Sequence, residues 1–214
     1  VVKSGTAQGQ WLICVTLPRD FPRPSNQGTC AAVVYGNDSF MDIFEPSDVR
    51  GNVGMVRSYT SNTGASIVGY GNNQSILNKY GIDPNAAGSF SNNNDYAHIR
   101  YADVLMYRSE AINETTGPSQ EAIDLLNEVR SRAGASLISL SSYSSKSALK
   151  VFIMDERRRE VYWEGKLRED AVRNGVYISI AQSKGRPALD YHTLFPIPLA
   201  EMDANKEMVQ NPGY

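Results

Sequence analysis

Residues 156–175, ERRREVYWEGKLREDAVRNG, place the strongest constraint on how this chain folds. In a helix Glu156, Glu160 and Glu164 would lie one turn apart on the same side, where like charges repel unless cations lie between them. The same side carries apolar residues, including Trp163. Carboxylates on a partly buried face need fixed cationic partners, so the segment is either a catalytic charge cluster or a joint between two layers of a scaffold.

The preceding sequence offers suitable partners in Arg100, Arg130 and Arg132. A guanidinium can bind a carboxylate through two hydrogen bonds, which suits packing between helices. A glycoside hydrolase would instead need two carboxyl groups roughly 5 to 10 Å apart with different pKa values. Nearby arginines lower the pKa of a carboxyl group, and a carboxyl group with a lowered pKa is a poor proton donor. We interpret the segment as an inter-helix clamp and expect no enzyme; a secreted hydrolase using Glu and Asp pairs is the third-ranked hypothesis.

From about residue 97 apolar residues recur every three to four positions, as in an amphipathic helix. AHIRYADVLMYRSEAINE predicts a first helix with Ile99, Ala102 and Ser109 on its buried face, the two small residues allowing close approach of a neighbour. QEAIDLLNEVRSRAG predicts a second helix that ends in a C-cap at Gly134. The short TTGPS connection between them predicts an antiparallel hairpin.

A third helix is predicted from about residue 148 to 173, with its N-cap at Ser145 or Ser147. Farther on, FPIP (195–198) predicts an extended strip, because each proline fixes φ and keeps its predecessor out of the helical region. QNPGY (210–214) predicts a turn, and we expect this end to pack back on the body of the protein.

Residues 1–95 have a different composition, which is rich in Gly, Asn, Ser, Thr and Pro. PRPSNQGT, SNTGAS and GYGNNQS are typical of turns and loops, whereas QWLICVTL and AAVVYG predict short strands. We therefore expect a mainly α protein: a loop-rich, ligand-facing segment at 1–95 with a few short strands, and a helical region at 96–214. The whole chain would be one domain of a longer protein.

Composition excludes several function classes. A formal net charge of −2 gives no indication of a nucleic-acid or membrane-surface partner. With two histidines, His98 and His192, and no CxxC or HExxH motif, we expect no metal site and no cofactor. Cys14 and Cys30 either pair, as in an extracellular protein, or remain separate thiols. The opening VVKSGTAQGQ has no features of a secretory signal and suggests a start internal to a longer protein.

Five motifs in order carry a family resemblance: IRYADVLMYRSEAINE, EAIDLLNEVRSRAG, ERRREVYWEG, FPIP and QNPGY. Together they resemble the C-terminal part of the SusD/RagB outer-membrane nutrient-binding lipoproteins of Bacteroidetes. FEPSDVRGN (44–52) resembles the family's acidic-turn-Arg segment through Asp48 and Arg50. One departure is Leu167, which stands where the family usually has Arg.

The resemblance implies a tetratricopeptide-type helical hairpin followed by a long clamp helix. It also implies a cell-surface protein, held to the outer membrane by a lipid anchor in an N-terminal part absent from these residues. Such a protein captures glycans for a SusC-like, TonB-dependent transporter. A peptide-binding member of the same family, or a helical-repeat protein-interaction module, is the alternative.

Glycan sites combine aromatic faces with amide and guanidinium donors. The loop-rich segment supplies such residues, with Tyr59 and Tyr70 in Gly-, Asn- and Ser-rich surroundings favoured over the others. For each candidate the alternative is a core residue beneath a long loop. The candidate ligand-binding set is Trp11, Tyr35, Arg57, Tyr59, Tyr70 and Asn72.

Overall fold

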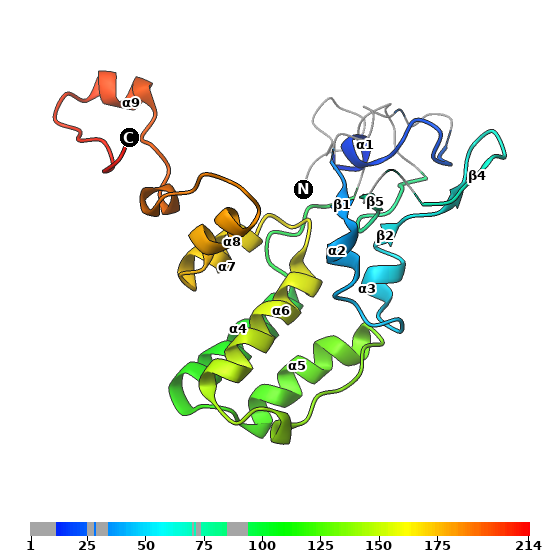
Figure 1. The fold of residues 1–214 in the computed structure, drawn as a ribbon, viewed down its shortest axis with the longest axis horizontal. Coiled ribbons are helices and arrows are strands. Elements are labelled where there is room, and N and C mark those ends of the chain that lie inside the picture. Colours follow the sequence, from blue (N-terminus) through cyan, green and yellow to red (C-terminus); the bar gives the residue numbers. More distant parts are fainter. Residues whose placement is uncertain (1–11, 25–27, 29–33, 70, 72–73, 85–93) are drawn as a thin grey trace. The chain divides into compact units, whose positions relative to one another are not determined.

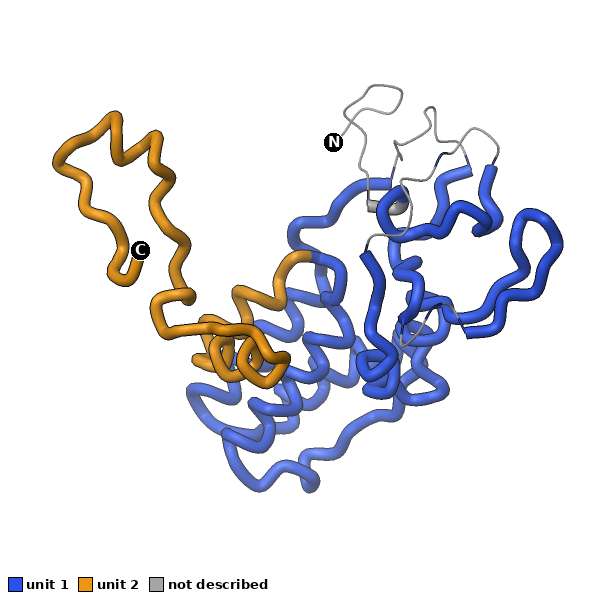
Figure 2. Tube along the Cα trace, turned by 45° about the horizontal axis from the view of Figure 1, so that its top comes forward, with its two compact units in different colours: residues 1–164 blue, residues 165–214 orange. Residues whose placement is uncertain are grey.

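The computed structural model describes residues 12–24, 28, 34–69, 71, 74–84 and 94–214. Three of the candidate ligand residues, Trp11, Tyr70 and Asn72, lie outside this part. The chain forms two compact units, residues 1–164 and 165–214 (Figures 1 and 2). The change from loops to helices expected near residue 95 therefore falls inside the first unit.

The predicted helical hairpin is confirmed. It consists of α4 (Tyr101–Thr116) and α5 (Gln120–Arg132), which lie side by side in Figure 1. The small residues bring the two backbones together, since the Ser109 hydroxyl donates to the Ala122 carbonyl at 2.8 Å and both residues are fully buried. Ile99 was expected on the buried face, but it precedes α4 and is 70% exposed. The helix begins only after Arg100, which has extended backbone as the N-cap.

Caps set the ends of the hairpin helices. The Ser119 side chain accepts from the Ala122 amide at the start of α5. At the other end the Gly134 amide donates to Ser131 and the Ala135 amide donates to Arg130, with Gly134 at φ +70°. The predicted glycine C-cap is therefore confirmed.

The third helix, α6 (Lys146–Val161), starts at the predicted N-cap Ser145. A short 3-10 helix, η1 (Leu140–Ser142), precedes it. The expectation that α6 continues to residue 173 was wrong. Trp163 and Gly165 both have left-handed backbone, with φ of +64° and +71°, which no α-helix can include. A separate helix, α7 (Leu167–Arg173), follows in the second unit.

The loop-rich part carries two small antiparallel sheets. One has the order β1 (Gly36–Asn37), β5 (Gln74–Leu77), β2 (Met55–Val56), and the other pairs β3 (Tyr59–Thr60) with β4 (Ser66–Ile67). In the first, Gly36 pairs with Ser75 and Met55 with Leu77; in the second, Tyr59 pairs with Ile67. Two short helices, α2 (Asp38–Met41) and α3 (Val49–Asn52), precede β2.

The strand predicted from QWLICVTL was wrong, because Leu12–Thr16 form a short helix, α1. Cys14 and Leu17, three positions apart, are both buried, and this spacing places them on one side of a helical turn but on opposite faces of a strand. Cys14 is disulfide-bonded. Its one possible partner in the sequence is Cys30, which lies outside the described residues.

Two apolar clusters hold the loop-rich part together. Leu17 and Ile76 form one, with Phe21, Tyr59 and Tyr80 packed around them. The other joins the sheet to the end of α6, and its members are Met55, Leu77 and Tyr162 with Val34, Phe40, Met41, Phe44 and Trp163 packed against them. The loop-rich part is therefore anchored on the helical layer and not folded independently of it.

The second unit contains α7, α8 (Tyr177–Ser183), the 3-10 helix η2 (Asp190–Thr193) and α9 (Leu199–Ala204). Its last residues fold back on FPIP. The Gln210 side chain bonds both the amide and the carbonyl of Ile197, at 2.8 and 2.9 Å, and the Tyr214 hydroxyl donates to the Leu194 carbonyl at 2.9 Å. Among the described helices, none is long and apolar enough to cross a membrane.

Replacing Gly134 by alanine should destabilise the first unit. A Cβ there would lie 2.9 Å from the Ser47 carbonyl oxygen in addition to the left-handed backbone. Gly81→Ala is the matched control, because Gly81 has φ +65° and open space around it. We expect the control to lose about 1 kcal/mol of unfolding free energy and Gly134→Ala to lose more, measured by urea denaturation. Equal losses would show that the Ser47 contact does not matter.

Candidate functional site

A buried ion-pair network surrounds the C-terminal half of α6, and we call it the clamp. Its central carboxylates, Glu156, Glu160 and Glu164, are all fully buried or nearly so. Arg159, on α6 itself, is also a member. The other members come from earlier segments of the chain: Glu45, Asp48, Arg50, Lys79, Arg100, Arg130 and Arg132.

Glu160 lies at the centre of the clamp and binds three guanidinium groups. Its two oxygens lie 2.6 Å from Arg132, 2.9 Å from Arg100 and 3.1 Å from Arg50. Arg100 precedes α4 and Arg132 ends α5, so this one carboxylate connects α6 to both helices of the hairpin. Through Arg50, Glu160 also connects α6 to the loop-rich part of the chain.

The flanking carboxylates are paired in the same way. Glu156 binds Arg130 at 2.6 Å, Arg50 at 2.8 Å and Arg159 at 3.1 Å. Glu164, beyond the end of α6, binds Lys79 at 2.5 Å and Arg100 at 2.8 Å. Each carboxylate thus shares a cation with its neighbour one turn away, which removes the repulsion that the sequence spacing alone would create.

Arg50 is positioned by its own local turn. Asp48 caps α3 by accepting from the Arg50 amide at 3.0 Å, and the same carboxylate binds the Arg50 guanidinium at 2.6 Å. Burial alone would lower the pKa of Arg50, but the hydrogen bond to Asp48 and the charge of Glu156 raise it above its usual value. Arg50 therefore stays charged inside the protein.

Lys79 and Tyr96 also cap the end of α6. The Lys79 ammonium donates to the carbonyls of Glu160 and Tyr162 at 2.5 and 3.0 Å, and the Tyr96 hydroxyl donates to the Glu164 carbonyl at 2.5 Å. Carbonyls at a helix C-terminus have no partner within the helix and favour nearby cations. Burial lowers the pKa of Lys79, whereas the charge of Glu164 opposes this shift. These caps hold the left-handed turn at Trp163.

The clamp arginines predicted from the sequence, Arg100, Arg130 and Arg132, all bind the α6 carboxylates, so that prediction is confirmed. Sequence reasoning noted Asp48 and Arg50 only as a family feature and did not connect them to α6. It missed Lys79 altogether. A single lysine in a loop carries no periodic signal, so no pattern in the sequence marks it.

The clamp geometry does not suit acid–base catalysis. A general acid must keep its proton near neutral pH, and each central carboxylate here lies against two or three cations. Glu45 lies at the edge of the clamp, where it pairs with Arg130. Hydrogen bonds from Ser136, and then the guanidinium of Arg130, lower the pKa of Glu45 to about 2.

Three of the candidate ligand residues lie within the described part of the chain. Tyr35 is 49% exposed, and the half-exposed Arg57 forms an ion pair with Asp38 at 2.7 Å. Tyr59 is half-buried, and its hydroxyl donates to Asp20 at 2.8 Å while its ring packs on Phe21. Tyr35 and Arg57 are thus available at the surface, whereas Tyr59 also has a packing role.

A pocket of about 280 Å³ opens over the clamp. Arg50, Lys79, Arg100, Arg132 and Glu160 line its charged side. The remaining lining residues are Val49, Val53, Gly54, Asn78 and Tyr162.

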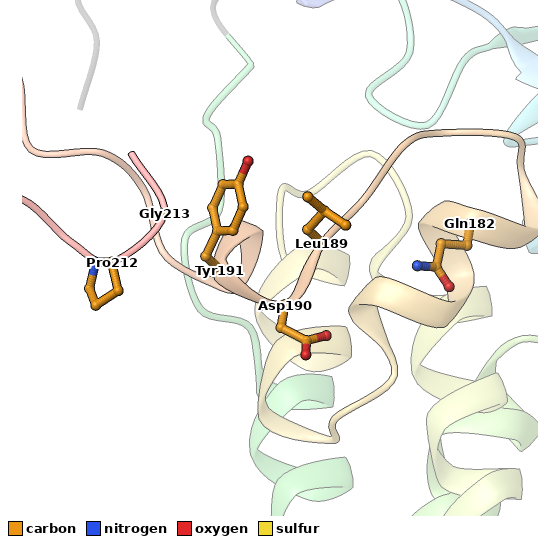
Figure 3. Close-up of a pocket in the computed structure, with 6 residues that line it drawn as sticks. All are labelled: Gln182, Leu189, Asp190, Tyr191, Pro212 and Gly213. Carbon is orange, nitrogen blue, oxygen red and sulfur yellow. The ribbon is translucent and has the colours of Figure 1, made fainter.

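A larger pocket, of about 450 Å³, lies in the second unit (Figure 3). Gln182, Leu189, Asp190, Tyr191, Pro212 and Gly213 line it. In Figure 3 the Tyr191 ring and the Asp190 carboxylate point to opposite sides of the η2 backbone. Its polar groups do not converge on one point, as they do in a preformed small-molecule site.

The comparison with known protein families matches residues 43–214 to the SusD family. The chain belongs to the SusD family. The matched region contains the whole clamp, from Glu45 to Glu164, so the clamp lies within the part of the chain that the family shares.

Individual relatives agree with this family assignment. Starch-binding protein SusD of Bacteroides thetaiotaomicron is 29% identical over 128 residues, which are 56% of this chain and 22% of that protein. A crystal structure of a SusD homologue from the same organism has a TM-score of 0.76 at 22% identity, covering 99% of this chain and 50% of the other.

A second similar structure is surface glycan-binding protein A from Bacteroides thetaiotaomicron in complex with laminarihexaose. Its TM-score is 0.63 at 20% identity, and the match covers 93% of this chain and 46% of that one. At this level of identity the structural matches show the SusD-like fold. This SusD-family chain spans about half the length of these solved relatives.

Glu160→Gln should strongly destabilise the first unit, because it removes the charge that balances three guanidinium groups. We expect a loss of about 3 kcal/mol or more in the free energy of unfolding, measured by urea denaturation. Glu121→Gln is the control: Glu121 also pairs with an arginine, Arg108, but is 57% exposed, so its loss should stay below about 1 kcal/mol. Similar losses in the two variants would contradict a buried clamp.

Glu45 predicts a pH dependence of stability. Its pKa in the folded protein is lowered from 4.5 to about 2, so its contribution is fully present above about pH 4.5 and is lost as the pH falls toward 2. The stability difference between the native chain and Glu45→Gln, from denaturation curves at several pH values, should therefore shrink across this window. A difference that is constant from pH 6 to pH 2.5 would contradict the ion pair.

Proposed function

We propose that this chain is part of a non-catalytic cell-surface protein that captures glycans for uptake. The observation that carries the proposal is the SusD-family match over residues 43–214. Two similar proteins have names that include their ligands, a starch-binding protein and a glycan-binding protein solved with laminarihexaose. The ligand we propose is accordingly an oligosaccharide or polysaccharide.

The clamp supports a binding role over a hydrolytic one. Hydrolysis of a glycosidic bond needs one carboxyl group that donates a proton and a second that acts as base or nucleophile. The carboxylates of the clamp are held by fixed cations, and their contacts connect the helices to the loop-rich part. Their role in the proposal is to fix the scaffold that presents the loops.

The proposed partners and location follow from the same family. The full-length protein would be held at the outer membrane by a lipid anchor and would deliver its ligand to a SusC-like, TonB-dependent transporter. Peptide capture is the second candidate function, because the family includes members that bind peptides.

Within the loop-rich segment, exposure favours Tyr35 and Arg57 as ligand contacts. An exposed tyrosine ring offers an apolar face to a sugar ring, and a guanidinium donates to its hydroxyl groups. Tyr59 remains in the proposed set together with Trp11, Tyr70 and Asn72. Because its hydroxyl and ring already have protein partners, Tyr59→Ala should cost stability as well as any binding.

Calorimetry of the chain against laminarihexaose, soluble starch and a peptide digest tests the proposal, with product formation followed in parallel. We expect saturable binding of a glycan without products. Tyr35→Ala should weaken the binding at least several-fold, whereas Tyr101→Ala, which removes an exposed tyrosine from α4, should not. Peptide binding without glycan binding would favour the second candidate, and released sugar would overturn a non-catalytic role.

A further inference from the structure

The mouth of the clamp has an unbalanced positive charge. The clamp as a whole has six cations and five carboxylates, which leaves one positive charge. Arg50 binds both Glu156 and Glu160, so these charges form one connected network. Four of the six cations, Arg50, Lys79, Arg100 and Arg132, line the pocket of about 280 Å³, whereas Glu160 is the one carboxylate among its lining residues.

Arg132 is the pocket cation whose positive charge is most exposed at the protein surface. Its side chain is 57% exposed, whereas those of Arg50 and Arg100 are 7% and 27% exposed. Only its Nη2 binds Glu160. Within the described part of the chain, its Nε and Nη1 donate to no protein group, so they can serve an anion in the pocket.

The pocket also has an apolar rim. Val49 and Val53, which are 49% and 64% exposed, line it together with the clamp cations. The C–H face of a sugar ring can pack on such side chains while an acidic group of the same ring binds a guanidinium.

We propose that this pocket binds a single uronic-acid unit of a glycan. The carboxylate would accept from Arg132, and the apolar C–H face would lie against Val49 and Val53. The volume is just below the lower limit of about 300 Å³ for ligand pockets, which suits one ring better than a chain. These residues differ from the loop residues proposed above, and the inference does not depend on them.

Saturation-transfer NMR and calorimetry with methyl glucuronide and methyl galacturonide test the site, with methyl glucoside and acetate as partial ligands. We expect binding of at least one uronide, and binding of glucoside or acetate at least tenfold weaker. Arg132→Gln should weaken uronide binding at least tenfold. Arg108→Gln is the matched control, because Arg108 is 63% exposed, pairs with one glutamate and lies outside the pocket.

Val53→Glu provides an independent variant, since it adds a negative charge at the rim without touching the clamp. It should weaken uronide binding while leaving the melting temperature nearly unchanged. The proposal is overturned if neither uronide binds at millimolar concentration, if acetate binds as well as the uronides, or if Arg132→Gln and Arg108→Gln have the same effect. If the chain binds a uronide but not laminarihexaose, the result counts against the proposed function alone. If it binds laminarihexaose but neither uronide, the result counts against this site alone.

Discussion

The Glu160 carboxylate and its three guanidinium partners are the interaction on which the rest of the first unit depends. Removing charges from water costs several kcal/mol per ion, so such a group persists only where its geometry is nearly complete. Here the partners come from the loop-rich part, from the start of α4 and from the end of α5. Apolar contacts can slide past one another, whereas these paired charges fix one register between the helices and the loops.

The same cluster explains why a bulky residue adopts left-handed backbone at the end of α6. Lys79, Tyr80 and Tyr96 donate to the carbonyls of residues 160, 162, 163 and 164, which satisfies backbone groups at the end of the helix. The Trp163 ring packs in the apolar cluster of Met55 and Leu77, which fixes the turn from the other side. Strain in the backbone is thus offset by contacts that arise from outside the helix.

Periodicity predicted the helical part well. The hairpin, the caps at Ser145 and Gly134, and three of the clamp arginines follow from local spacing and from the need of buried carboxylates for cations. The end of α6 was not predictable, because VYWEG keeps a helical pattern and only distant side chains stop the helix. The helical conformation of Leu12–Thr16 and the part played by Lys79 depend likewise on tertiary contacts that no short window of sequence contains.

The clamp also determines the order in which this chain can fold. Arg50 and Glu160 are separated by 110 positions, and Lys79 and Tyr162 by 83. Closing such long loops costs entropy before the contacts form, and proteins with distant contacts fold slowly. The α4–α5 hairpin, in contrast, needs only neighbouring residues. The hairpin can therefore assemble first and offer Arg130 and Arg132 as a partial template for the distant segments that carry Arg50 and Lys79.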